Sequence, residues 1–158
     1  MDYKDKYIKY KTKYLELNNK IGGKKMKKRN KGLSNRNTLT MENRKYNVSV
    51  TEPWFSLILL GLKTVEGRKN RGLFAQMKVG DIVEWTNDSI IPRSVQTRIT
   101  GKAVYPTFRE YLETEGLDKC LPGISDMNNG LSIYYKYFTK EEEKEFGVVA
   151  IHLELVEN

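Results

Sequence analysis

The chain has 158 residues, with 28 lysines and arginines against 20 acidic residues and a formal net charge of +8 at pH 7. This length suits one domain with a substantial core. The single cysteine, Cys120, excludes an internal disulfide, and one histidine leaves no Cys/His spacing for zinc. The apolar runs are far shorter than the roughly 20 residues of a membrane span. We therefore expect a soluble, intracellular, monomeric protein, in cytoplasm or nucleus, with no membrane contact, cofactor or metal.

The positive charge is concentrated at the N-terminal end. Residues 1–45 contain 15 basic and 4 acidic residues, a net charge of +11, whereas residues 46–158 contain 13 and 16, a net charge of −3. A basic arm on a mildly acidic body indicates an appendage for nucleic acid or another anionic surface. It argues against a protein that coats DNA with its whole surface.

Residues 1–22 carry tyrosines and aliphatic residues at spacings of four and three, and Gly22-Gly23 follows. The spacing predicts an amphipathic helix with lysines on the opposite face. Such a helix either binds a protein partner, which would make the chain an adaptor, or frays as an isolated helix. The spacing also resembles the leaders of proteins from large DNA viruses.

Residues 23–45 are predicted to form a disordered linker, because they combine many basic residues with almost no apolar ones. Such a segment would bind phosphates regardless of base sequence, with an affinity that falls steeply with salt. A nuclear-localisation signal and a solvated tether are the alternatives. The nucleic-acid-binding candidates in this segment are Lys24, Lys25, Lys27, Lys28 and Arg29.

The predicted domain, residues 46–158, begins with a strand and then a helix. Residues 46–50 alternate between apolar and polar side chains, as in a half-buried strand. Pro53 suits the first position of the next helix, and Gly61 suits its end. Trp54, at the start of this helix, is expected to be a core anchor.

A short strand is predicted at residues 63–68. Alternation along it would place Thr64, Glu66 and Arg68 on one face, with Lys63 on the other. A lysine beside a carboxylate and a guanidinium offers a base whose pKa a cleft can tune, and a fork for a phosphate. Equally, Glu66 and Arg68 could form a simple surface ion pair.

The rest of the domain is predicted to contain strands interrupted by short helices. Residues 117–130 are expected to be irregular, because they contain two turn signals. Strands outnumber helices and the last strand is strongly apolar, which favours an α+β fold, a small mixed β-barrel with peripheral helices. The expected strands cover residues 82–86, 94–105 and 148–156. The expected helices cover residues 107–115 and 139–146, and each opens with a capping-box pattern, at Thr107 and at Thr139.

An aromatic cluster precedes the last predicted helix. Tyr134, Tyr135 and Tyr137 lie close together in the sequence, in a helix or a loop folded over a groove. Three clustered tyrosines are difficult to bury together, and exposed ones would stack on unpaired bases at roughly 1–3 kcal/mol each. At least one of the three is expected to pack in the core.

The motif Gly61-Leu62-Lys63-Thr64-Val65-Glu66-Gly67-Arg68 resembles the G-x-K-x-x-E-x-R signature of the ASCH (ASC-1 homology) domain. Glu52-Pro53-Trp54, the Gly80-Asp81 turn and the final strand are also similar to that family. The resemblance covers roughly residues 46–156. It implies a PUA-like β-barrel with a cleft beside the signature, and a role on RNA or another nucleic acid.

The resemblance implies that the cleft holds a nucleotide or a single strand, with RNA as the expected class. In the alternative, some family members are enzymes, either ribonucleases or amidohydrolases of a modified cytidine. There Lys63 would be the base or electrostatic stabiliser and Glu66 its acidic partner, although the threonine of the amidohydrolases falls where this chain has Glu66. The binding candidates in the domain are Lys63, Thr64, Glu66, Arg68, Arg71, Tyr134, Tyr135 and Tyr137.

Overall fold

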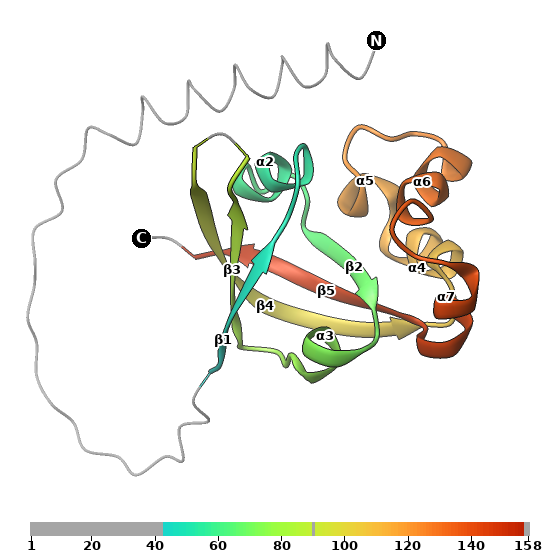
Figure 1. Ribbon diagram of the computed structural model, residues 1–158, viewed down its shortest axis with the longest axis horizontal. Coiled ribbons are helices and arrows are strands. Elements are labelled where there is room, and N and C mark those ends of the chain that lie inside the picture. Colours follow the sequence, from blue (N-terminus) through green and yellow to red (C-terminus); the bar gives the residue numbers. More distant parts are fainter. Residues whose placement is uncertain (1–42, 90, 157–158) are drawn as a thin grey trace, which may run out of the picture. The chain divides into compact units, whose positions relative to one another are not determined.

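The computed structural model describes residues 43–89 and 91–156, and one curled five-stranded sheet forms its centre (Figure 1). The strand order is β1-β3-β4-β5-β2, in which β1 runs parallel to β3 and the other neighbours are antiparallel. The sheet forms a half-barrel with β1 and β2 as its two edge strands. The strands are β1 (Lys45–Ser49), β2 (Val65–Lys69), β3 (Ile82–Asn87), β4 (Arg93–Tyr105) and β5 (Val148–Leu155).

Six helices in the described part of the chain surround this sheet. Figure 1 shows α4 to α7 gathered beside β2 and the ends of β4 and β5, whereas α2 lies near β1 and β3. This arrangement confirms the predicted α+β class with a PUA-like curled sheet and peripheral helices. The helices are α2 (Trp54–Leu59), α3 (Gly72–Gln76), α4 (Phe108–Glu115), α5 (Leu117–Cys120), α6 (Met127–Tyr134) and α7 (Lys140–Phe146).

The predicted threonine caps start two of these helices. The Thr107 hydroxyl accepts a hydrogen bond from the Glu110 N–H at the start of α4, and Thr139 forms a complete capping box with Glu142 at the start of α7. Gly61, with a φ of 66°, follows the end of α2. The residues at these positions therefore determine where α4 and α7 begin and where α2 ends.

The prediction that residues 117–130 are irregular was wrong in part, because α5 and the first turn of α6 lie there. Asp126 caps α6 by accepting the N–H of Asn129. Gly130 allows the close packing of α6 on α5, since a Cβ at this position would lie 2.8 Å from Leu117 Cδ1. Tertiary packing stabilises two short helices that turn residues alone would not predict.

Strand β5 separates two hydrophobic clusters. The first contains Trp85, Phe55 and Ile99, and the second contains Phe108 and Tyr111. Residues 148–151 are buried on both faces of this strand, because Val149 and Ile151 belong to the first cluster and Val148 and Ala150 to the second. The helices α4 to α7 pack on the face of the sheet that carries the second cluster, and they lie next to β2.

Two sequence predictions, the amphipathic helix of residues 1–22 and most of the basic linker, lie outside the described residues. Within residues 43–89 and 91–156, no helix is both long enough and apolar enough to cross a membrane.

Candidate functional site

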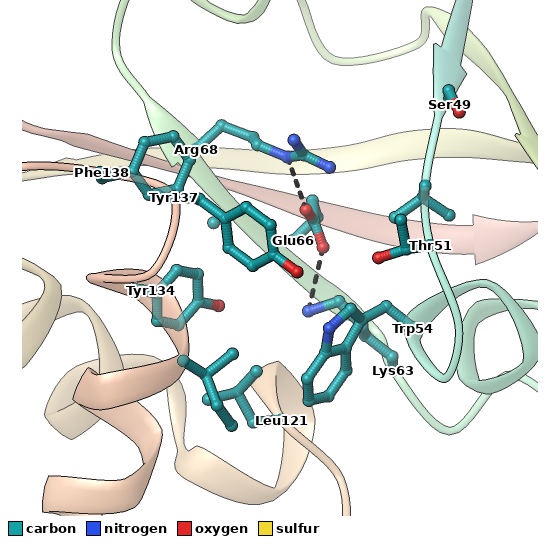
Figure 2. A pocket seen from close by; sticks show the side chains of 13 residues that line it. Ser49, Thr51, Trp54, Lys63, Glu66, Arg68, Leu121, Tyr134, Tyr137 and Phe138 are labelled. Carbon is teal, nitrogen blue, oxygen red and sulfur yellow. Dashed lines mark hydrogen bonds and ion pairs between the residues drawn. The ribbon is translucent and has the colours of Figure 1, made fainter.

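A cavity of about 200 Å³ opens where the two edge strands of the half-barrel face each other, next to α2 and the end of α6 (Figure 2). Its lining combines charged residues of the Gly61–Arg68 motif with aromatic side chains. The residues that line it are Ser49, Val50, Thr51, Trp54, Lys63, Glu66, Gly67, Arg68, Leu121, Ile133, Tyr134, Tyr137 and Phe138.

Lys63 is buried at the base of the cavity. Its ammonium nitrogen lies 3.0 Å from Glu66 Oε2, donates a hydrogen bond of 3.0 Å to the Val65 carbonyl and donates another to the Cys120 carbonyl. An ammonium has three N–H groups. All three are therefore directed at protein acceptors, and Lys63 joins α5 to the start of β2.

Glu66 is held between two cations. One carboxylate oxygen faces Lys63, and the other accepts a hydrogen bond of 2.7 Å from Arg68 Nε. Burial alone would raise the pKa of Glu66, but the charges and hydrogen bonds of Lys63 and Arg68 lower it below the ordinary value of 4.5. The carboxylate is therefore ionised at neutral pH.

The predicted separation of Lys63 and Glu66 onto opposite strand faces was wrong. Strand β2 begins only at Val65, and the N–H of Lys63 bonds to the Leu57 carbonyl at the end of α2. Lys63 therefore lies outside the alternating segment, and its side chain can turn toward Glu66. The two residues meet as a buried pair.

Arg68 forms the upper wall of the cavity. Its Nε is anchored by Glu66, its guanidinium carbon lies 5.2 Å from the Phe74 ring centre, and its side chain is 25% exposed. Within residues 43–89 and 91–156, its two terminal nitrogens have no hydrogen-bond partner. Figure 2 shows the guanidinium beside the Glu66 carboxylate, on the side away from Lys63. These two nitrogens are therefore available to an anion.

Aromatic rings form the two side walls. Figure 2 shows Tyr134 and Tyr137 on one side and Trp54 on the other. Tyr137 is 63% exposed, whereas Tyr134 is buried, stacks on Phe108 at 4.5 Å and donates its hydroxyl to Tyr111. Burial, with Glu66 nearby, raises the pKa of Tyr134 well above 10. Tyr137 therefore offers the more exposed ring on this side, beside the half-buried Phe138.

Trp54 differs from its predicted role as a simple core anchor. It packs against both hydrophobic clusters but is only half-buried, and it also lines the cavity. The Lys63 nitrogen lies 5.8 Å from its ring centre. Its position at the start of α2, next to the motif, is a sequence signal that could have indicated this second role.

Three of the candidate residues lie away from the cavity. Tyr135 donates its hydroxyl to the Glu143 carboxylate, and Arg71 is exposed with its guanidinium 4.9 Å from the Phe146 ring centre. The backbone of Thr64 bonds to Lys119 and Leu153, and its side chain is not part of the lining.

The five basic candidates of the arm, from Lys24 to Arg29, lie outside the described residues. The structure therefore brings together Lys63, Glu66, Arg68, Tyr134 and Tyr137 among the predicted residues. Sequence reasoning missed the contributions of residues 49–51, because nothing in a short edge strand signals that it lies opposite the motif.

The cavity has the chemistry of a site that binds an anionic group together with a planar ring. Together Lys63, Glu66 and Arg68 carry a net charge of +1, and apolar or aromatic side chains supply most of the remaining surface. Among the described residues, no group of three or more His, Cys, Asp or Glu side chains could hold a metal ion. The side chains here can bind, orient and desolvate a small planar anion.

Comparisons with known proteins agree with this architecture. The model of the ASCH domain matches residues 48–157. The crystal structure of hypothetical protein PH0355 has a TM-score of 0.65 and 33% sequence identity, covering 71% of this chain and 99% of that one. The solution NMR structure of protein PF0455 from Pyrococcus furiosus has a TM-score of 0.60 and 33% identity, covering 72% and 99%. No curated protein matches the chain.

Proposed function

The chain belongs to the ASCH domain family, and from this premise we propose that it binds single-stranded RNA, with one nucleotide held in the cavity beside the motif. One observation carries the proposal. The partly exposed guanidinium of Arg68 and the exposed ring of Tyr137 line the same cavity, and a nucleotide presents the matching pair of groups, a phosphate and a base.

Arg68 supplies the phosphate contact. Its Nε is fixed by Glu66 at 2.7 Å, so the guanidinium is held in one orientation before a ligand arrives. A planar guanidinium binds two phosphate oxygens at once, and such charge-assisted bonds are about twice as strong as neutral ones. The net charge of +1 around Glu66 suits the single negative charge of a phosphodiester.

Tyr137 and Trp54 supply the base contact. Stacking of an unpaired base on an aromatic ring is worth roughly 1–3 kcal/mol and tolerates any base. The cavity, at about 200 Å³, has room for a single ring system and not for a base pair. This size favours an unpaired strand over a duplex.

The geometry favours binding over catalysis. Lys63 would have to break one of its three hydrogen bonds before it could act as a base. Burial raises the pKa of the Cys120 thiol to about 11, so it is not a nucleophile at neutral pH. We therefore propose that Lys63 and Glu66 position Arg68, and that the basic arm adds phosphate contacts of low sequence preference.

The proposal is tested by fluorescence anisotropy of a labelled single-stranded RNA of about ten nucleotides with the full chain. Arg68→Met removes the phosphate contact, and Arg109→Met removes the same charge from the exposed surface of α4, where Arg109 faces Glu113. Because Arg68→Met loses the charge-assisted hydrogen bond to the phosphate, we expect this variant to bind the RNA at least about tenfold more weakly. Arg109→Met is expected to stay within about twofold of wild type.

Equal losses in the two variants would overturn the cavity as the binding site. The same titration with DNA of the same sequence separates the two classes of strand. Gel analysis of the recovered RNA distinguishes binding from cleavage, and intact RNA is the expected result.

A further inference from the structure

The cavity lies at the opening of the half-barrel, between two strand edges that no described strand covers. Strands β1 and β2 are the two ends of the sheet order, and residues of both strands line the cavity, including Ser49 and Gly67. An edge strand presents a row of unpaired N–H and C=O groups. The hydrogen bonds that β1 makes to β3, and β2 to β5, show which backbone N–H and C=O groups point away from the sheet.

In β1, alternate residues bond to β3. The Arg44 carbonyl accepts from Ile82, and the Val50 N–H donates to Thr86, so the even-numbered residues direct both backbone groups at β3 in this parallel pair. The odd-numbered residues direct theirs away. Ser49 and Asn47 therefore both point their N–H and C=O at the open edge, but only Ser49 lines the cavity.

In β2, the same reasoning identifies Gly67. The Thr64 carbonyl accepts from Leu153, and the Asn70 N–H donates to Gly147, so residues 66 and 68, which lie between them, direct their backbone groups at β5 in this antiparallel pair. Val65 and Gly67 face the other way. The Val65 carbonyl confirms this direction, because it accepts from the Lys63 side chain.

We propose that the backbone edges of Ser49 and Gly67 read the base of the bound nucleotide, so that selectivity among bases comes from main-chain hydrogen bonds. The ligand class is an unpaired nucleobase with a donor and an acceptor on one edge. This inference rests on the proposed function. It adds base selectivity, which neither stacking nor a phosphate contact supplies.

The chemistry of a strand edge suits this role. The N–H and C=O of one residue point the same way, and they match a base edge that carries one acceptor and one donor. A base that mismatches leaves a buried group unpaired, which costs roughly 1–3 kcal/mol. Gly67 brings its backbone to the cavity without a side chain of its own.

The test is an amide NMR titration of the labelled full chain with AMP, CMP, GMP, UMP and, as the probe without a base, ribose 5-phosphate. The amide protons of Ser49 and Gly67 are expected to move with at least one mononucleotide and to stay in place with ribose 5-phosphate. The Asn47 amide is the internal control, because it points outward from the same strand but lies outside the cavity lining.

Two results contradict different parts of the account. If the Arg68 side-chain N–H moves with all five probes while Ser49 and Gly67 do not, base reading by the backbone is wrong and phosphate binding stands. If no cavity signal moves with any probe, the proposed function itself fails, and base reading fails with it.

A variant pair provides a second readout. Ser49→Pro removes the outward N–H of Ser49, and Asn47→Pro removes the equivalent N–H outside the cavity; proline is tolerated at such positions of an edge strand. Ser49→Pro is expected to weaken the preferred mononucleotide about tenfold, while Asn47→Pro stays within about twofold of wild type. Equal effects of the two prolines would overturn the inference.

Discussion

The Lys63 nitrogen and Glu66 Oε2 lie 3.0 Å apart, in a pair whose side chains are only 2% and 7% exposed. The same lysine binds the carbonyls of Val65 and Cys120. It therefore connects the end of α2, the start of β2 and α5 at one buried point. Glu66 extends this connection to Arg68 at the cavity wall.

Replacement of this lysine should cost far more than loss of a surface charge. Lys63→Met leaves Glu66 buried with only Arg68 as a partner, and breaking a buried pair from one side costs about 3–5 kcal/mol. Lys69→Met breaks the partly exposed pair with Glu142, where the atoms are 2.6 Å apart, and should cost less than about 1 kcal/mol. Urea denaturation followed by tryptophan fluorescence measures both. Similar losses would show that Lys63 is not a structural anchor.

The pH dependence of stability should reveal the lowered pKa of Glu66. Because its pKa in the folded state lies below the ordinary 4.5, its ion pairs stabilise the fold fully above about pH 4.5. That contribution is lost as the pH falls through the folded-state pKa. The difference in unfolding free energy between wild type and Glu66→Gln should therefore be constant at neutral pH and shrink on acidification. A difference that stays constant down to about pH 3 would contradict the ion pairing.

Replacement of Gly67 by alanine, the residue with the smallest side chain, should destabilise the fold. A Cβ at this position would lie 2.6 Å from the ring of Tyr111, which is fully buried. Gly67→Ala is expected to lower the unfolding free energy by about 1–3 kcal/mol. In a Tyr111→Leu background the ring is absent, and the added cost should fall to less than half. An unchanged cost in the double-mutant cycle would show that the ring is not the cause.

The two tyrosines near the end of α6 should have different effects on RNA affinity. Tyr137→Ala removes the exposed ring of the cavity and should weaken binding by roughly 1–3 kcal/mol, about fivefold to more than a hundredfold. Tyr135→Ala removes a hydroxyl that binds Glu143 outside the cavity, so its main effect should be on stability. Anisotropy at matched salt measures the affinities. A loss of affinity for Tyr135→Ala as large as that for Tyr137→Ala would contradict base stacking in the cavity.

The sequence predicted those features that depend on local chemistry. The caps at Thr107 and Thr139, the stop at Gly61 and the strand periodicity follow from backbone and side-chain preferences within a few residues. The meeting of Lys63 with Glu66 did not follow from the sequence. It depends on where β2 begins, and Lys63 lies before that point, with its N–H bonded to the Leu57 carbonyl of α2.

The candidate site was predictable in part for the same reason. The motif indicated Glu66 and Arg68, which do line the cavity. The sequence could not show which of the three neighbouring tyrosines, Tyr134, Tyr135 and Tyr137, is buried and which is exposed. Tyr134, the last residue of α6, is buried against Phe108 and Tyr111 of α4, whereas Tyr137 lies beyond the helix and is exposed. The contribution of Ser49 depends on the curl of the whole sheet, which brings two distant edge strands opposite each other.

The central claim is that RNA enters the cavity and does not bind only to the basic arm. Photo-crosslinking of single-stranded RNA containing 4-thiouridine to the full chain, followed by mass spectrometry of the linked peptides, locates the contact directly. We predict cross-links to Trp54 or Tyr137, with their loss in Arg68→Met. Cross-links confined to residues 1–45 would contradict the account.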